Sequence, residues 1–185
     1  MCGRLELIIG PMFSGKSTEL IKHANRYISI GKNVLAINHQ INNRYGSNKI
    51  TTHDKKVFEN CIIIDKLSEV HKTYSQKFNE SDIIIIEELQ FFSDGFDFIK
   101  NTVDKTNKTV ITAGLSGDFK RNPFGDVLRL IPYADSLTQL SAYCKKCGDG
   151  TLANFTKRIT NDSDVTIVGT SNEYEAVCRK HYLEN

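Results

Sequence analysis

The chain has 185 residues, which is enough for one complete hydrophobic core and a small appendage but not for two domains of typical size. Its 24 lysines and arginines are interspersed with 22 aspartates and glutamates, so there is no basic stripe and we expect no nucleic-acid partner. The apolar runs fall far short of the ~18 residues of a membrane span, and the five cysteines suit a metal better than disulfides. We therefore expect a cytoplasmic protein with no membrane partner.

Short apolar runs predict the β-strands, because each run is bounded by turn residues and lacks helical spacing. The runs cover residues 5–9, 34–37, 61–64, 83–86, 110–113 and 137–142. Apolar residues at helical spacing predict helices over residues 18–30, before Gly31, and over residues 96–103. The polar segment 38–49 and the Gly- and Pro-containing segment 116–125 are predicted loops. Strands that alternate with helices indicate an α/β fold with a parallel sheet, whose ligands collect beyond the carboxyl ends of the strands.

Residues 10–17 read GPMFSGKS and match the phosphate-binding pattern G-x-x-x-x-G-K-[ST] between a predicted strand and a predicted helix. Gly10 and Gly15 permit backbone angles that turn successive N–H groups toward phosphate oxygens at the helix N-terminus. Lys16 can then reach the β- and γ-phosphates, and the Ser17 hydroxyl can bind the magnesium ion that bridges them. The pattern predicts a nucleoside triphosphate site; the alternative is a Gly-rich turn that fits by chance.

An acidic pair follows the four isoleucines of residues 83–86, where P-loop proteins carry the acid that holds magnesium. Because strand side chains alternate between faces, we expect Glu87 and Glu88 to point in different directions. One carboxylate could serve the metal, and the other could take a proton from an acceptor hydroxyl. The alternative is that the pair merely ends the strand in solvent.

Gln90, Phe91 and Phe92 come directly after this pair. Rings stack on a nucleobase and an amide pairs with its edge, so this group could select a nucleoside, although packing in the core is the alternative for each ring. Phe119 and Phe124 lie in the predicted loop 116–125, where there is less core to fill, and could close the site.

A Cys-x-x-Cys pair and a Cys-x-x-His pair match the ligand set of a tetrahedral structural zinc site without an open position for catalysis. The four ligands are Cys144, Cys147, Cys178 and His181. The alternatives are a redox dithiol at Cys144 and Cys147, thiols that are unrelated to one another, or a zinc ribbon that contacts nucleic acid through the neighbouring basic residues. Cys61, inside an apolar run, is expected to be buried and inert.

The zinc ligands also divide the chain. We predict a nucleotide-binding α/β domain over residues 1–142 and a zinc-bound domain over residues 143–185. Residues 148–177 are expected to form a loop, or lasso, which the metal closes at its base.

In this order, four features are similar to those of type II thymidine kinases: the P-loop, Glu88-x-Gln90-Phe91-Phe92, Phe119-x-Arg121-x-Pro123-Phe124-Gly125 and the Cys/His cluster. The resemblance runs nearly end to end. It implies a RecA-like α/β domain with a zinc-bound lasso over the nucleoside, and transfer of the ATP γ-phosphoryl group to the 5′-hydroxyl of thymidine. It further implies deoxyuridine as a second acceptor, a homotetramer, and feedback inhibition by thymidine triphosphate.

The resemblance also implies roles for single residues. Glu88 would be the general base, Lys16 and Arg44 would act on the transferring phosphoryl group, and Ser17 and Glu87 would hold magnesium. The ATP cradle would comprise Gly10, Pro11, Met12, Phe13, Ser14, Gly15, Lys16, Ser17 and Thr18. The thymidine site would comprise Met12, Phe91, Leu115, Phe119, Phe124, Thr156 and Tyr174 and the backbone of Ile167, Val168 and Gly169. To this set the chemistry of the residues themselves adds the amide of Gln90.

Three residues depart from the family pattern. Glu87 stands where an Asp is usual, Leu89 stands where a smaller residue is usual, and Asn42 replaces an acid two positions before Arg44. We expect altered kinetics rather than loss of activity. Two other functional classes stay open at this stage: a P-loop NTPase that uses hydrolysis to drive a partner, and a nucleotide-binding regulator with a degenerate site.

Overall fold

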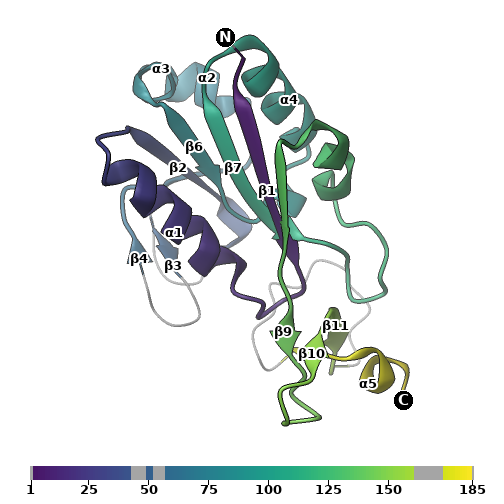
Figure 1. Cartoon of the computed structure of the whole chain (residues 1–185). Coiled ribbons are helices and arrows are strands. Elements are labelled where there is room, and N and C mark those ends of the chain that lie inside the picture. Colours follow the sequence, from purple (N-terminus) through teal and green to yellow (C-terminus); the bar gives the residue numbers. More distant parts are fainter. Residues whose placement is uncertain (1, 43–48, 52–56, 161–172, 185) are drawn as a thin grey trace.

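The computed structural model describes residues 2–42, 49–51, 57–160 and 173–184, and its centre is a six-stranded sheet in which every neighbouring pair is parallel (Figure 1). In spatial order the strands are β5 (Ile62–Ile64), β2 (Val34–His39), β6 (Ile83–Ile86), β7 (Thr109–Leu115), β1 (Arg4–Gly10) and β8 (Ser136–Gln139). Each strand overlaps an apolar run in the sequence, so the predicted α/β class with a parallel sheet is confirmed.

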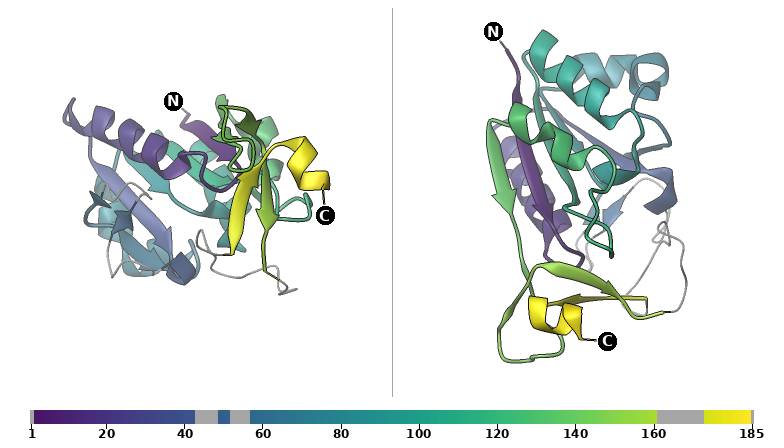
Figure 2. Two further views of the ribbon diagram at one scale, coloured as in Figure 1. Left: turned by 90° about the horizontal axis from the view of Figure 1, so that it is seen from below. Right: turned by 90° about the vertical axis from the view of Figure 1, so that its right-hand side faces the viewer.

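Helices cover both faces of this sheet (Figures 1 and 2). Helix α1 (Lys16–Ile28) packs on one face, where it buries Leu20, Ile21 and Ala24 against the sheet. The opposite face is covered by α2 (Glu69–Thr73), α3 (Ser75–Glu80), α4 (Gly95–Lys105) and the 3-10 helix η3 (Val127–Tyr133). Among the described residues, none of these helices has the length and apolar character that a bilayer crossing requires.

Strand β6 shows why the sheet is buried on both faces. Its isoleucines alternate, with Ile84 and Ile86 in the core below α4 and Ile83 and Ile85 in the core below α1. A strand covered on both sides needs apolar residues at every position, which is the continuous run that the sequence has here. Glu87 and Glu88 come directly after this strand, so they lie at the carboxyl edge of the sheet.

A small module lies beyond that carboxyl edge (Figures 1 and 2). It consists of two antiparallel pairs and a short helix: β9 (Ala142–Tyr143) with β10 (Leu152–Ala153), β11 (Phe155–Arg158) with β12 (Tyr174–Val177), and α5 (Arg179–Leu183). The module has its own apolar cluster of small side chains, against which Phe13 of the P-loop packs. The predicted domain boundary falls inside β9 and stays a prediction.

Three local predictions are wrong. The run 137–142 is not one strand, because β8 ends at Gln139 and Ala142 pairs with β10 instead. Residues 148–177 are not a simple loop, because their described parts contain β10, β11 and β12. The predicted loop 38–49 begins later than expected, since Asn38 and His39 complete β2 and are followed by the 3-10 helix η1 (Gln40–Asn42).

The remaining elements are short. A further 3-10 helix, η2 (Leu89–Phe91), follows the acidic pair, and the two-residue strands β3 (Ile50–Thr51) and β4 (Val57–Phe58) pair antiparallel. The loop predicted over residues 116–125 is confirmed, because it contains neither helix nor strand.

Candidate active site and metal centre

The P-loop connects the end of β1 to the start of α1. Gly15 has φ of 83°, a left-handed conformation that favours glycine, and it directly precedes the first helical residue, Lys16. A Cβ on Gly10 would lie 2.6 Å from the carbonyl oxygen of Leu140, so the backbone at this position leaves no room for a side chain. Both glycines of the pattern are therefore required by the geometry of the loop. The result is a glycine-containing loop that leads directly into a helix N-terminus, an arrangement that suits phosphate groups.

Lys16 turns back over this loop. Its ammonium group donates a hydrogen bond to the carbonyl oxygen of Pro11 at 2.7 Å, and the Ser14 hydroxyl donates to the same oxygen at 2.8 Å. Burial lowers the pKa of Lys16, while the carboxylates of Glu88 and Glu87 act in the opposite direction. Lys16 thus lies between the phosphate loop and the acidic pair.

Ser17 and Glu87 join the P-loop to the end of β6. The Ser17 hydroxyl donates to Oε1 of Glu87 at 2.6 Å, and Glu87 is only 3% exposed. Its second oxygen, Oε2, is buried without a hydrogen-bond partner among the described residues. Burial raises the pKa of Glu87 and the neighbouring charge of Glu88 raises it further, although Ser17 and Lys16 oppose the shift. A buried carboxylate with an unused oxygen beside a hydroxyl is a natural ligand pair for a hard cation.

Glu88 lies in a turn rather than in the strand. Its backbone has φ of 55° and ψ of 45°, which is left-handed and rare for a residue with a side chain. The two carboxylates have different hydrogen-bond partners, Ser17 for Glu87 and Gln90 for Glu88, and neither acid belongs to β6, which ends at Ile86. Leu89 follows with no exposed surface, which places the bulky residue at this family position in the core.

The Gln90 side chain is also buried, with 5% of its surface exposed. Its Nε2 donates to Oε2 of Glu88, and its Oε1 accepts the backbone N–H of Leu115 at the end of β7 at 3.1 Å. These two partners place it in the site, beside the acid that the sequence singles out.

The two rings after Gln90 have different environments. Phe91 is half-buried and meets Phe124 of the loop 116–125 edge to face, with ring centres 5.6 Å apart. Phe92 is 1% exposed and belongs to the main core, so the packing interpretation is confirmed for this ring. His39 lies against both rings, at 5.7 Å from Phe91 and 4.7 Å from Phe92. Burial lowers the pKa of the His39 imidazole. The sequence gives no signal for His39 as a site residue, because the polar segment 38–49 predicts a loop at this position.

Several contacts join the small module to this edge of the sheet. The backbone N–H of Met12 donates to the Thr156 hydroxyl at 3.0 Å, which ties the P-loop to β11. The Tyr182 hydroxyl donates to the carbonyl oxygen of Phe119 at 2.8 Å, which ties α5 to the loop 116–125. The guanidinium of Arg158 lies 3.9 Å from the ring centre of Phe119 and 5.0 Å from that of Tyr174. Arg158 thereby brings two predicted thymidine-site residues together.

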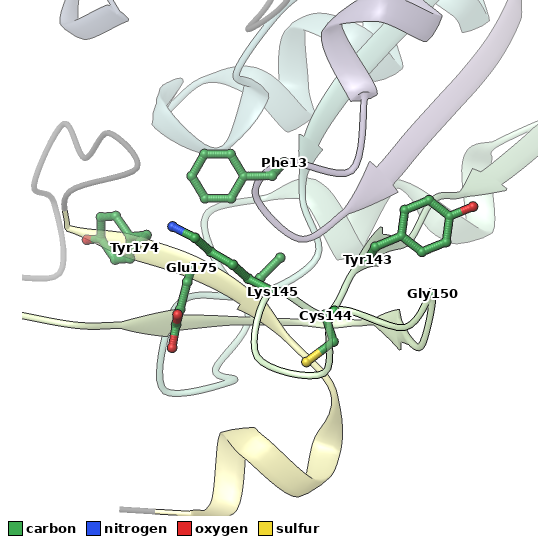
Figure 3. Close-up of a pocket in the computed structure, with 9 residues that line it drawn as sticks. Phe13, Tyr143, Cys144, Lys145, Gly150, Tyr174 and Glu175 are labelled. Atoms are coloured by element: carbon green, nitrogen blue, oxygen red, sulfur yellow. The ribbon is translucent and has the colours of Figure 1, made fainter.

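A cavity of about 550 Å³ lies between the P-loop and this module (Figure 3). Phe13 borders it on one side, and Tyr143, Lys145 and Tyr174 border it on the module side. Figure 3 shows the Lys145 amine directed toward Phe13, whereas the Cys144 sulfur points away toward α5. Its volume lies within the range of small-molecule sites.

The Cys/His group forms a compact four-ligand centre. Nδ1 of His181 lies 3.4, 3.3 and 3.4 Å from the sulfurs of Cys144, Cys147 and Cys178, and the Cys147 and Cys178 sulfurs are 3.9 Å apart. A zinc ion with Zn–S of about 2.3 Å and Zn–N of about 2.0 Å in a tetrahedron spaces its ligands by about 3.8 Å (S to S) and about 3.5 Å (S to N). The four ligand atoms, all within 4.8 Å of one another, therefore fit zinc, and the group can hold it.

The family assignment follows from comparison with known proteins. The thymidine kinase family model matches residues 3–182. This chain belongs to the thymidine kinase family. It is 40% identical to thymidine kinase a of Arabidopsis thaliana over 99% of this chain and 76% of the plant protein. It is also 39% identical to the thymidine kinase of vaccinia virus (strain Western Reserve), over 99% of this chain and 98% of the viral protein.

Membership in the thymidine kinase family makes the positions of the predicted residues informative. Around the carboxyl edge the structure gathers Lys16, Ser17, Glu87, Glu88, Gln90, Phe91, Leu115 and Phe124, and the contacts of Met12, Thr156, Phe119 and Tyr174 link the module to this edge. Arg44 and the segment Ile167, Val168 and Gly169 lie outside the described residues. Sequence reasoning missed Arg158 and Tyr182, since nothing in their local pattern distinguishes them from surface residues.

Proposed function

We propose that this chain transfers the γ-phosphoryl group of ATP to the 5′-hydroxyl of thymidine in nucleotide salvage, giving thymidine monophosphate and ADP, with deoxyuridine as a second acceptor. The observation that carries the proposal is the convergence of the P-loop, Glu87 and Glu88 at one edge of the sheet, in a chain that belongs to the thymidine kinase family. A phosphate cradle and a carboxylate base are the two parts that phosphoryl transfer to an alcohol needs.

At the donor end, the amides of the P-loop and the Lys16 ammonium would hold the β- and γ-phosphates. Ser17 and Glu87 would hold magnesium, and the support for this role is the buried, unpartnered Oε2 of Glu87 beside the Ser17 hydroxyl. When bound, magnesium supplies positive charge that neutralises the phosphate oxygens. The contact with Ser17 indicates that the longer side chain of Glu87 still reaches the P-loop in place of the usual Asp.

At the acceptor end, Glu88 would take the proton of the 5′-hydroxyl as the new O–P bond forms and the bond from the γ-phosphorus to the bridging oxygen of ADP breaks. Its place after β6, near Lys16 and apart from the Ser17 contact of Glu87, supports this division of labour. Arg44 would neutralise charge on the transferring group, an assignment that rests on the family resemblance.

Thymine recognition is proposed for the hydrophobic set, in which Phe91 and Phe124 are in contact and Phe119 and Tyr174 share Arg158. Met12, Leu115 and Thr156 would complete the walls, and the backbone of residues 167–169 would pair with the polar edge of the base. Buried backbone partners discriminate strongly, because an analogue that lacks a matching group leaves them unpaired.

Zinc at the Cys/His group would have a structural role, because all four positions are taken by protein atoms. A homotetramer, feedback inhibition by thymidine triphosphate and a cytoplasmic location belong to the same proposal and rest on the resemblance. The proposal includes neither a nucleic-acid nor a membrane partner.

A nucleoside panel tests the proposed reaction. The protein is incubated with magnesium ATP and thymidine, deoxyuridine, deoxycytidine or deoxyadenosine, and monophosphates are separated by chromatography. We expect thymidine monophosphate in the largest yield and deoxyuridine monophosphate second. ATP consumption that depends only on added single-stranded nucleic acid would instead favour a hydrolysis-driven NTPase, and tight thymidine binding without turnover would favour a regulator.

A further inference from the structure

We propose that Gln90 is a positioning residue that fixes the orientation of the Glu88 carboxylate for proton abstraction. The inference rests on the proposed function, because it gives Gln90 its role through the general base. It differs from the expectation that the Gln90 amide reads the nucleobase.

The two hydrogen bonds of Gln90 determine how its amide is turned. The backbone N–H of Leu115 is a donor, so the atom of Gln90 that faces it at 3.1 Å must be the carbonyl oxygen. The NH₂ group is thereby directed to the Glu88 carboxylate, to which it donates. An amide held at its oxygen by the end of a central strand is a fixed donor, and a fixed donor selects one orientation of the carboxylate that it contacts.

Two glycines pack closely around residue 90, Gly114 near its side-chain amide and Gly125 against its backbone. A Cβ on Gly114 would lie 3.2 Å from Oε1 of Gln90 and 2.7 Å from Cγ2 of Val127. A Cβ on Gly125 would lie 2.4 Å from the backbone oxygen of Gln90, and Gly125 also has φ of +57°. Gln90 is thus enclosed between the end of β7 and the end of the loop 116–125.

The position of Glu88 explains why such a partner matters. Glu88 follows the last residue of β6 and is half-buried in a left-handed turn, so strand pairing does not hold it in place. Its side chain can rotate about three bonds, and catalysis needs one narrow arrangement of the base and the acceptor hydroxyl. Gln90 is bonded to the end of β7 at one side of its amide and to Glu88 at the other, so the end of β7 determines where the Glu88 carboxylate lies. Leu115 also belongs to the proposed thymine wall. The hydrogen bond from Leu115 to Gln90 would therefore align the general base, Glu88, with the pocket that holds the nucleoside.

A double-mutant cycle tests this role. Turnover and KM are measured with magnesium ATP and thymidine for wild type, Gln90→Met, Glu88→Gln and the double variant. Methionine keeps the length of glutamine but can neither donate to Glu88 nor provide a good acceptor for Leu115. We expect Gln90→Met to lower kcat by about 10-fold or more, with KM for thymidine and for ATP changed by less than about 3-fold. In the Glu88→Gln background the same substitution should change kcat by less than about 2-fold.

Thr112→Val is the matched control. Thr112 is a fully buried residue of β7 whose hydroxyl donates to the carbonyl oxygen of Ile86 at 3.1 Å. Its loss removes a buried hydrogen bond near the same edge, and we expect kcat to stay within about 2-fold of wild type. If Gln90→Met does not fold, as judged by thermal melting, Gln90→Leu replaces it. Leucine is uncharged and can neither donate to Glu88 nor accept from Leu115, so the same loss of kcat is expected.

Three results would overturn the inference: an unchanged kcat in the Gln90 variants, the same fold-loss in both Glu88 backgrounds, or a rise in thymidine KM at unchanged kcat. The last result would return Gln90 to reading the base. Failure of the proposed function is distinguishable, because then wild type makes no thymidine monophosphate or Glu88→Gln alone retains normal turnover.

Discussion

The contact between Tyr182 and Phe119 predicts that the small module, which carries the Cys/His group, holds part of the proposed thymidine pocket in place. Tyr182 comes directly after His181 of the Cys/His group, and its hydroxyl donates to the carbonyl oxygen of Phe119 at 2.8 Å. Tyr182→Phe removes this one atom and keeps the ring that lies 5.4 Å from Phe155. The loop carrying Phe119 then loses a fixed attachment to α5.

The size of the effect follows from that single hydrogen bond. A neutral hydrogen bond contributes a net ~1 kcal/mol, which corresponds to roughly a 5-fold change in an equilibrium constant. If the bond holds Phe119 in its thymidine-binding position, the Kd for thymidine should rise by about that factor. The Kd for ATP should change by less than about 2-fold, because the P-loop is tied to the module by Met12 and Thr156 instead.

Isothermal titration calorimetry with thymidine and, separately, with magnesium ATP measures both constants. Tyr133→Phe serves as the control, since Tyr133 lies on η3 against Phe96 on the face of the sheet covered by α4. Unchanged thymidine affinity in Tyr182→Phe would show that this attachment does not shape the acceptor pocket. Equal weakening of thymidine and ATP binding would show a general disturbance of the fold, and would equally refute the reasoning.

Three further predictions concern the base, the metal and a buried thiol. Glu88→Gln should lower kcat by ~100-fold or more while ATP binding persists; near-normal turnover would remove Glu88 from the role of base. Elemental analysis should find one zinc per chain, and chelation should weaken thymidine binding before ATP binding; metal-free protein with full thymidine affinity would contradict this order. Burial raises the pKa of Cys61 to about 12, so its thiol stays protonated at pH 8 and should resist iodoacetamide in the native protein, whereas exposed Cys2 should react. Mass spectrometry checks this, and rapid labelling of Cys61 without unfolding would be the contrary result.

Much of the main sheet could be predicted from sequence, because its strands carry signals that depend on few neighbours. The four isoleucines of β6 are all buried, as an unbroken apolar run requires in a strand covered on both faces. The P-loop glycines and the paired Cys and His spacings likewise encode local geometry, and the described structure places the four zinc-ligand atoms within 4.8 Å of one another.

The small module could not be predicted in the same way. Strands β9 and β10 have two residues each, too few for any periodic pattern, and their pairing depends on chain closure around the Cys/His group. Glu88 illustrates a second limit. Its backbone is in a left-handed turn and not in the strand. This conformation is uncommon for residues other than glycine, so the sequence gives no signal for it.

Gln90 illustrates a third limit. Its amide group, placed beside two aromatic residues, suggests contact with a nucleobase. Its actual partners are Glu88 and the N–H of Leu115, and the second comes from β7, which is distant in the sequence. Arg158 is similar, since its position over Phe119 and Tyr174 brings together residues that are far apart in the chain.

The central claim is phosphoryl transfer from ATP to a nucleoside alcohol at the edge where Lys16, Glu87 and Glu88 converge. Its most direct test is the stoichiometry of the reaction with thymidine, in which ADP and thymidine monophosphate are quantified from the same samples over time. One thymidine monophosphate should form for each ADP, with little ADP formed when thymidine is omitted. ADP release at the same rate without thymidine, or with no thymidine monophosphate beside it, would contradict the account.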